Sequence, residues 1–240
     1  MALPAGQRTI GPHFVPEGAI QGMLFDCDGT LLNTMPLFFH SWEEVCPQFG
    51  LRITIDDFYA YAGWPLPSIV RDLHQRHRAA DASDDFVASF LAAKQAAHER
   101  YEAQMGHPEP IGCVVKLARE AAAAGIPVCI ATSGLRTHVE PHLAAAGLDD
   151  LFNPAKGNIV CAADVPKGKP APDIYLEAAR RIGADPRACR AFEDGESGLM
   201  SAHAAGCHVI DVTFMDEYPM VEGLRLAKAR DEAARTWLRE

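Results

Sequence analysis

Two aspartates one residue apart are the first side chains in the chain whose spacing suggests chemistry. Asp26 and Asp28 follow a short apolar run, and a Gly-Thr turn comes directly after them. Such a run is typical of a buried parallel strand, and side chains two residues apart leave a strand in similar directions. Two carboxylates held close together repel each other unless a cation lies between them, and Mg²⁺ prefers oxygen ligands. The pair therefore indicates a Mg²⁺ site, although an Asx turn at the end of a strand uses the same residues.

Two further segments carry groups that could bind a phosphate. Thr132, Ser133 and Gly134 lie between a predicted strand and a predicted helix, where exposed backbone amides and a nearby hydroxyl can form a phosphate site. Lys169 lies in a Gly/Pro-rich loop that can hold its ammonium group rigidly against a phosphoryl group. Each segment has a simpler interpretation, because Ser and Thr are common helix N-caps and a loop lysine is commonly solvated.

A second pair of carboxylates, Glu193 and Asp194, follows another apolar run. Paired carboxylates at the end of a strand can complete the ligand set of a metal, or they can cap a helix, where negative charge is favourable. Open α/β folds place their active sites at the carboxyl ends of the strands. The sequence therefore predicts four polar segments at one edge of a sheet.

The elements that position these segments alternate between helix and strand from residue 111 onward. Predicted helices at 111–124, 136–146, 171–182 and 198–205 alternate with predicted strands at 127–131, 158–161, 189–192 and 208–212. This alternation predicts an α/β fold with a doubly wound parallel sheet, to which the strand before Asp26 also belongs.

The segment 35–107 breaks this alternation. Its apolar residues recur at helical spacing, and it contains no convincing buried strand. We therefore expect an α/β core domain made of residues 1–34 and 108–240, with an inserted all-helical cap domain at 35–107. Within the core domain, residues 1–21 are expected to form an extended lead-in or a frayed end, and residues 221–240 a charged surface helix.

Composition limits the partners and the compartment. The 240 residues carry a formal net charge of −10 and include seven scattered cysteines without a Cys-x-x-Cys pair. An acidic chain without a Lys/Arg block argues against nucleic acid as the main partner, and scattered cysteines are typical of a reducing compartment. No apolar run approaches the length of a membrane span. We expect a cytoplasmic protein, a monomer or weak dimer, with neither nucleic acid nor a membrane as its partner.

Together and in this order, the four segments resemble the haloacid dehalogenase superfamily of phosphohydrolases. The sequences DxDGTL, TSG, GKPAPDIY and FEDGESG look most like those of its β-phosphoglucomutase and sugar-phosphatase branch, and the resemblance spans residues 20–215. It implies a Rossmann-like core with a helical cap after the first motif. It also implies a Mg²⁺ cofactor and a small phosphorylated sugar or related metabolite as the substrate.

The resemblance further implies a role for each motif residue. Asp26 would be the nucleophile that takes the phosphoryl group as an aspartyl phosphate, and Asp28 would be the general acid and base. The phosphoryl oxygens would be bound by four residues: Thr132, Ser133, Gly134 and Lys169.

In this scheme, the Mg²⁺ ion would be held by the side chains of Asp26, Glu193 and Asp194. The backbone carbonyl of Asp28 would be a further ligand. Substrate specificity would reside in the cap, in the loop that contains Gly63 and Trp64.

Three functions are open on the sequence alone. The first is a Mg²⁺-dependent phosphatase that hydrolyses a small phosphorylated sugar through an aspartyl phosphate. The second is a β-phosphoglucomutase, whose cap resembles Gly-x-Ser-Arg and a hinge histidine where this chain has Gly63-Trp64-Pro65-Leu66 and Phe38. The third is a non-catalytic binding protein on the same scaffold, which would usually have lost an aspartate or the lysine. This chain has kept both aspartates and the lysine, so the binding protein is disfavoured. The phosphatase is the function that we expect.

Overall fold

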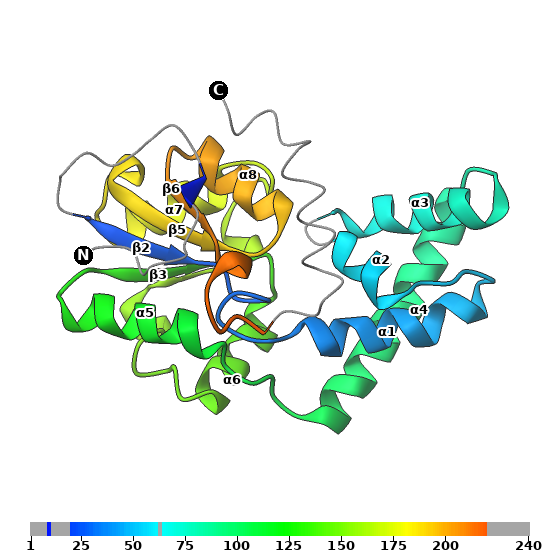
Figure 1. The fold of residues 1–240 in the computed structure, drawn as a ribbon, viewed down its shortest axis with the longest axis horizontal. Helices are drawn as coiled ribbons and strands as arrows, with labels where there is room; N and C mark the ends of the chain where they lie inside the picture. The colour runs from blue at the N-terminus through cyan, green and yellow to red at the C-terminus, as the bar shows by residue number, and fades with distance from the viewer. Residues whose placement is uncertain (1–8, 11–19, 62–63, 220–240) are drawn as a thin grey trace. The chain divides into compact units, whose positions relative to one another are not determined.

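A computed structural model describes residues 9–10, 20–61 and 64–219 of the chain. The structure divides into two compact units: Thr34–His107 make a helical unit, and the described residues before and after this segment make a core unit. The core unit contains a six-stranded sheet in the order β1-β6-β5-β2-β3-β4 (Figure 1). Strands β2 to β6 run parallel, and β1 is antiparallel to β6. The predicted α/β fold with a parallel sheet is confirmed.

The strands are short, and helices cover the sheet on both faces (Figure 1). The strands are β1 Thr9–Ile10, β2 Gly22–Phe25, β3 Val128–Ala131, β4 Ile159–Val160, β5 Cys189–Glu193 and β6 His208–Asp211. The helices of the core unit are α5 Gly112–Ala123, α6 Arg136–Ala145, α7 Asp173–Arg181 and α8 Glu196–Ala204. Short 3₁₀ turns are η1 Pro154–Lys156, η2 Ala162–Asp164, η3 Pro186–Ala188 and η4 Val212–Phe214.

Strand β2 lies between β5 and β3 and separates two apolar layers. Met23 and Phe25 belong to the layer that contains residues of α5 and α6, whereas Leu24 belongs to the layer that contains residues of α7 and α8. This is the alternation that a strand imposes on successive side chains. The ring of Phe25 stacks on that of Phe192 in β5, with centroids 4.7 Å apart. Because these side chains are almost fully buried, the end of β2 is a rigid support for the loop that follows it.

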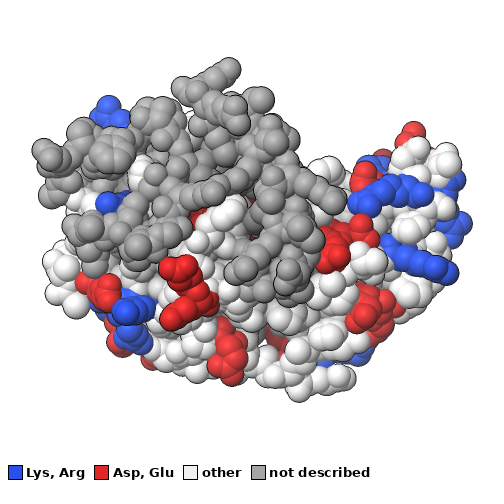
Figure 2. Space-filling view, in the orientation of Figure 1, with Lys and Arg blue, Asp and Glu red and all other residues white. Residues whose placement is uncertain are grey.

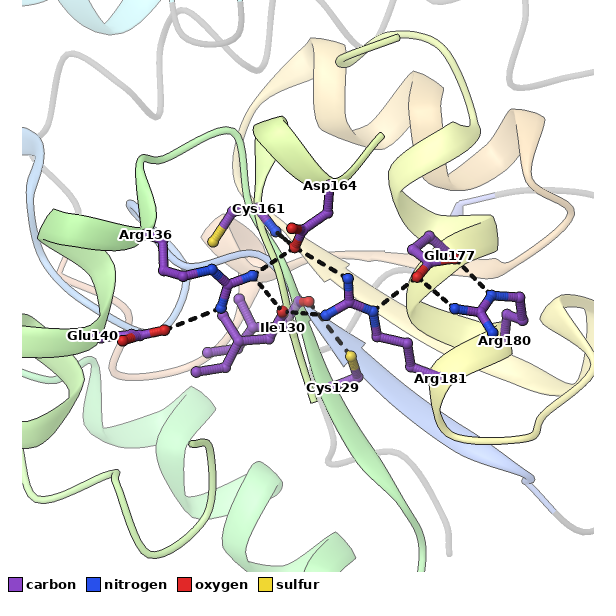
Figure 3. Close-up of polar contacts among 10 residues, drawn as sticks. Cys129, Ile130, Arg136, Glu140, Cys161, Asp164, Glu177, Arg180 and Arg181 are labelled. Atoms are coloured by element: carbon purple, nitrogen blue, oxygen red, sulfur yellow. Dashed lines mark hydrogen bonds and ion pairs between the residues drawn. The ribbon is translucent and has the colours of Figure 1, made fainter. Parts of the chain in front are cut away.

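Two arginines cover the open edge of the sheet at β4. The backbone carbonyl of Ile159 accepts hydrogen bonds from Arg136 at 3.3 Å and from Arg181 at 2.7 Å. Both guanidinium groups also pair with Asp164, at 2.6 and 3.1 Å respectively (Figure 3). An unsatisfied carbonyl on an edge strand is a template for pairing with another chain. The arginines of α6 and α7 therefore satisfy this carbonyl and tie β4 to helices of both layers.

The helical unit consists of α1 Met35–Gln48, α2 Ile55–Ala60, α3 Leu66–Arg78 and α4 Asp84–Met105. Helices α1 and α4 pack against each other, and the rings of Trp42 and Phe90 lie 5.3 Å apart in this contact. Thr54 and Asp57 form a capping box that starts α2. Apolar contacts between these helices thus help to hold the unit together.

The chain leaves and re-enters the core unit at adjacent points. The backbone amide of Asn33 donates to the carbonyl of Glu109 at 2.9 Å, and the amide of Ile111 donates to the carbonyl of Leu31 at 2.8 Å. An insertion whose two ends meet in this way leaves the order of the strands around it unchanged.

The sequence patterns located most elements but misplaced some ends. Strand β1 lies within the segment expected to be an extended lead-in, and a two-residue strand is too short to show periodicity. Helix α8 begins at Glu196, two residues before the predicted start, so it follows the acidic loop directly. Strand β4 spans two residues instead of the predicted four. The helix predicted at 221–240 lies outside the described residues.

Acidic and basic side chains are interspersed on the face of the molecule that Figure 2 shows. Basic residues gather on α3, whose last turn contains Arg76, His77 and Arg78. Among the helices that the structure describes, none is both long enough and apolar enough to span a membrane.

Candidate active site

The carboxyl ends of β2 and β5 bring Asp26, Lys169 and Glu193 together. Asp26 directly follows β2, Glu193 is the last residue of β5, and the two strands are hydrogen-bonded neighbours. The ammonium nitrogen of Lys169 lies 2.6 Å from Oδ1 of Asp26 and 2.5 Å from Oε1 of Glu193. All three side chains are more than nine-tenths buried. The interpretation of Lys169 as a solvated loop lysine is therefore wrong.

This cluster holds more negative than positive charge. Burial raises the pKa of Asp26 well above its ordinary value, the Lys169 ammonium opposes that shift, and the carboxylates of Glu193, Asp194 and Asp28 reinforce it. Burial alone would lower the pKa of Lys169, but the carboxylates of Asp26 and Glu193 outweigh it and hold that pKa above its ordinary value. One ammonium group among four carboxylates leaves the site favourable for a further cation.

Glu193 is held by donors on both of its carboxylate oxygens. Oε1 accepts hydrogen bonds from Lys169 and, at 2.8 Å, from the hydroxyl of Tyr175. Oε2 accepts from the backbone amides of Asp194 at 3.1 Å and Gly195 at 3.4 Å. A carboxylate is stable in the interior only when its charge is paired and hydrogen-bonded, and these contacts meet that condition.

Asp194 lies against the loop that follows Asp26. Its Oδ1 accepts a hydrogen bond from Oγ1 of Thr30 at 3.1 Å. Gly29 has a φ of +82°, and a Cβ added there would come within 2.3 Å of Oδ2 of Asp194, so this close approach requires glycine. The carbonyl of Gly29 also accepts a hydrogen bond from the hydroxyl of Tyr218 at 2.6 Å. The Gly-Thr turn thus fixes the loop and Asp194 against each other.

The segment after β3 lies next to Asp28. A Cβ added at Gly134 would be 3.2 Å from Oδ2 of Asp28 and 3.2 Å from Oγ1 of Thr132. Thr132 is buried and its hydroxyl accepts a hydrogen bond from the amide of Gly134 at 2.9 Å, whereas Ser133 is exposed. The N-cap of α6 is the apolar Leu135. The interpretation of Thr132 or Ser133 as the cap of this helix is therefore wrong.

The acidic residues fit a divalent cation. Ligand oxygens of Asp26, Glu193 and Asp194 all lie within 4.8 Å of one another. Carboxylate oxygens are the ligands that Mg²⁺ takes in proteins, together with water. The excess negative charge of the cluster favours the same kind of ion. The side chains present at this edge of the sheet therefore suit Mg²⁺.

A parallel sheet with a buried aspartate-lysine-glutamate cluster at its carboxyl edge defines an α/β protein with an acidic, metal-compatible site. A model of the haloacid dehalogenase-like hydrolases matches residues 20–206 of the chain. The chain therefore belongs to this family of hydrolases, and the prediction from its four motifs is confirmed.

Two curated relatives and a solved structure agree with this assignment. The chain is 31% identical over 201 residues to a fructose-1-phosphate phosphatase of Escherichia coli, which covers 81% of this chain and 97% of that one. It is 31% identical over 207 residues to hexitol phosphatase A of the same organism, with coverage of 86% and 89%. A mutant of the protein CbbY from Rhodobacter sphaeroides, solved with xylulose-(1,5)bisphosphate, superposes with a TM-score of 0.59. It is 26% identical and covers 79% of this chain and 84% of that one. The chain is a phosphohydrolase of this family.

The residues predicted for the site lie in both units. In the core unit, Asp26, Lys169, Glu193 and Asp194 meet at the carboxyl edge of the sheet, and Gly134 lies next to Asp28, whereas Ser133 is exposed. Trp64 belongs to the helical unit, where it is 44% exposed and its ring centroid lies 5.5 Å from that of Tyr61. Gly63 lies outside the described residues.

Sequence reasoning missed several residues that shape this site. Tyr175 lies within the GKPAPDIY motif, but its contact with Glu193 joins two elements that are distant in sequence. Thr30 lies within the first motif, and its bond to Asp194 spans 164 positions. The motifs were the signal that could have located both residues, whereas their partners depend on the fold.

Gly198 of α8 leaves the space that the Glu193 carboxylate occupies. A Cβ added at Gly198 would lie 1.8 Å from Oε1 of Glu193 and 2.0 Å from its Cδ. Alanine in place of glycine inside a helix is ordinarily stabilising by about 0.5–1 kcal/mol. Here the added methyl group must displace a buried carboxylate from its donors. We expect Gly198→Ala to lower kcat by about tenfold or more, since small displacements of site residues are costly.

A matched control for this change is Gly112→Ala, in the first turn of α5. A Cβ added at Gly112 would meet no heavy atom of the described residues within 4 Å. Steady-state kinetics and thermal melting of both variants separate the two effects. A Gly198→Ala enzyme with wild-type kcat would contradict the placement of Glu193 in the working site.

Proposed function

We propose that the enzyme is a Mg²⁺-dependent phosphatase that hydrolyses a small phosphorylated sugar or polyol through an aspartyl phosphate. The observation that carries this proposal is the buried contact of Lys169 with Asp26 and Glu193, beside the carboxylate of Asp194. The similarity to a fructose-1-phosphate phosphatase and a hexitol phosphatase supports the substrate class. A cytoplasmic monomer or weak dimer stays a prediction.

In the first step, a carboxylate oxygen of Asp26 attacks the phosphorus atom and the ester P–O bond breaks. Asp28 gives its proton to the leaving alcohol oxygen as that bond breaks. In the second step, Asp28 takes a proton from a water molecule, which attacks the phosphorus. The bond between phosphorus and Asp26 then breaks, and inorganic phosphate leaves with the Asp26 carboxylate restored.

The phosphoryl group needs positive charge around it, because both the nucleophile and the substrate are anionic. Lys169 supplies a fixed ammonium group at the Asp26 carboxylate. The hydroxyls of Thr132 and Ser133 would add donors at the end of β3, where the amide of Gly134 already donates to the Thr132 hydroxyl and Gly134 itself lies beside Asp28.

The carboxylates of Asp26 and Asp194 and the backbone carbonyl of Asp28 would hold Mg²⁺. When bound, Mg²⁺ neutralises the phosphoryl oxygens and helps to orient them. The sequence also assigned Glu193 to this ion. The two oxygens of Glu193 already accept hydrogen bonds, so its contribution to the metal would be secondary to its contact with Lys169.

We also propose that residues 35–107 are a cap domain and that residues 1–34 and 108–240 are the catalytic core domain. The loop with Gly63 and Trp64 would contact the end of the substrate that lies away from the phosphate. The partly exposed indole of Trp64 offers an apolar face for the carbon skeleton of a sugar or polyol.

Trp64→Ala is expected to raise KM by about tenfold or to change the order of preferred substrates, with kcat changed little. The reason is that this substitution removes binding at the remote end and leaves Asp26, Lys169 and the metal ligands in place. Ile55→Ala, at another exposed apolar residue of the helical unit, is the control. Equal kinetics of Trp64→Ala and wild type on several sugar phosphates would remove Trp64 from the substrate site.

A screen of phosphorylated sugars and polyols, with release of inorganic phosphate as the readout, tests the proposed function. Multiple turnovers without a bisphosphate activator are expected. The mutase alternative is tested with β-glucose 1-phosphate and a trace of the 1,6-bisphosphate. Rapid formation of glucose 6-phosphate with negligible free phosphate would make the enzyme a mutase. Turnover of neither kind would favour a binding protein.

A further inference from the structure

Tyr175 makes two contacts with the catalytic cluster, and the proposed reaction gives it no role. It lies in the first turn of α7 and is fully buried. Its hydroxyl donates to Oε1 of Glu193 at 2.8 Å. The ammonium nitrogen of Lys169 lies over its ring, 5.3 Å from the centroid. The same side chain therefore contacts both Glu193 and the lysine that Glu193 binds.

The hydrogen bonds of Glu193 show why the hydroxyl matters. A carboxylate offers about four lone-pair sites, two on each oxygen. On Oε2 these sites face the amides of Asp194 and Gly195, and on Oε1 they face Lys169 and Tyr175. Each of the four sites has one donor, so the orientation of the carboxylate is fully determined. Removal of the hydroxyl would leave a buried acceptor on Oε1 without its donor, which is costly.

Lys169 needs this support because its side chain is flexible. A lysine presents a compact charge on a four-carbon stem with many rotamers. Here the ammonium group lies between the carboxylates of Asp26 and Glu193, and both attract it. A fixed Glu193 oxygen on one side and the Tyr175 ring face leave the ammonium in the position that contacts Asp26.

We propose that Tyr175 is a positioning residue that sets the Lys169 ammonium for phosphoryl transfer, through the Glu193 carboxylate and through its own ring. The inference rests on the proposed phosphatase function. Tyr175 stands six positions after Lys169, on the helix into which the lysine loop leads. The contact between the Tyr175 ring and the ammonium group therefore links the flexible side chain of Lys169 to α7, the helix that follows it in the chain.

Tyr175→Phe keeps the ring over Lys169 and removes only the hydroxyl. We expect kcat for release of phosphate from a sugar phosphate to fall by about tenfold, with KM nearly unchanged, because the ammonium is misplaced mainly in the transition state. Tyr101→Phe is the matched control, since it also removes a phenol that is hydrogen-bonded to a carboxylate, that of Glu44 in the helical unit. The control is expected to keep the wild-type kcat.

A second readout does not depend on turnover. An ammonium group that is paired and shielded from water exchanges slowly enough to be seen in ¹H–¹⁵N spectra of lysine side chains. The wild type is expected to show such a signal, assigned by its loss in Lys169→Met, and Tyr175→Phe is expected to weaken or shift it. In the Glu193→Gln background, Tyr175→Phe should add little, because residues that act as a unit are not additive.

The outcomes separate the inference from the function on which it rests. A folded Tyr175→Phe enzyme with wild-type kcat and an unchanged Lys169 signal would overturn the positioning role and leave the phosphatase proposal intact. If wild-type enzyme releases no phosphate from any phosphorylated substrate, the proposed function is wrong. The spectra of wild type and Tyr175→Phe then decide the inference about Lys169 without reference to turnover.

Discussion

Asp26→Asn is expected to abolish phosphate release, with a loss of about 10³-fold or more. The asparagine amide is nearly isosteric with the carboxylate but is a poor nucleophile, so the aspartyl phosphate cannot form. The fold should be retained, because Asp26 lies at the end of a strand whose backbone is already paired on both sides. Lys169 loses one carboxylate in this variant and keeps its contact with Glu193.

The stability of this variant provides an internal check. Burial and three neighbouring carboxylates make the charged form of Asp26 unfavourable in the metal-free enzyme. A neutral asparagine should therefore melt at a temperature no lower than that of the metal-free wild type. Asp149→Asn, at an exposed carboxylate, is the control that should leave turnover unchanged. Retention of one tenth of wild-type activity by Asp26→Asn would rule out Asp26 as the nucleophile.

The position of the first motif could be predicted because the apolar residues before it identify a buried strand from local sequence alone. A run of apolar residues that must be buried on both sides forms the middle of a parallel sheet, and its loop must then lie at the carboxyl edge. The same reasoning applies to Glu193 at the end of β5. The pairing register of β2 and β5 then brings Asp26 and Glu193 side by side, because they follow Phe25 and Phe192, which are direct partners.

The contacts of the site could not be predicted in the same way. The bond between Thr30 and Asp194 and the contact of Tyr175 with Glu193 join residues on different elements. No spacing along the chain encodes such contacts, because the first depends on the pairing of β2 with β5 and the second on how α7 packs on the sheet. Gly198 shows the same limit: its sequence context is an ordinary helix, and only the carboxylate of Glu193 beside it explains the glycine.

Short elements were missed, or predicted with wrong ends, for a different reason. A two-residue strand such as β1 has too few side chains to show an alternation, and it is held by pairing with β6. Strand β4 was predicted but is equally short, and its Ile159 carbonyl is satisfied by Arg136 and Arg181, which are distant in sequence. The hydrophobic pattern of a sequence indicates which side chains are buried. Strands β1 and β4 instead depend on backbone pairing with neighbouring strands, which that pattern does not show.

Removal of Mg²⁺ by a chelator is expected to abolish activity, and addition of Mg²⁺ in excess should restore it. The reason is the charge of the site: Lys169 alone cannot offset the carboxylates of Asp26, Glu193 and Asp194 when an anionic substrate approaches. Ca²⁺ should bind and support little turnover, because its larger and looser coordination sphere misplaces the reacting groups.

Metal binding can also be measured without turnover. A ligand that binds only the folded protein raises its melting temperature by mass action, so millimolar Mg²⁺ should stabilise the wild type. Asp194→Asn should lose most of this stabilisation, because it removes one oxygen anion from the set that lies within 4.8 Å. Asp149→Asn should retain the stabilisation, since its carboxylate is exposed. Full turnover in excess chelator, or equal Mg²⁺ stabilisation of Asp194→Asn and wild type, would show that the acidic cluster is not the metal site.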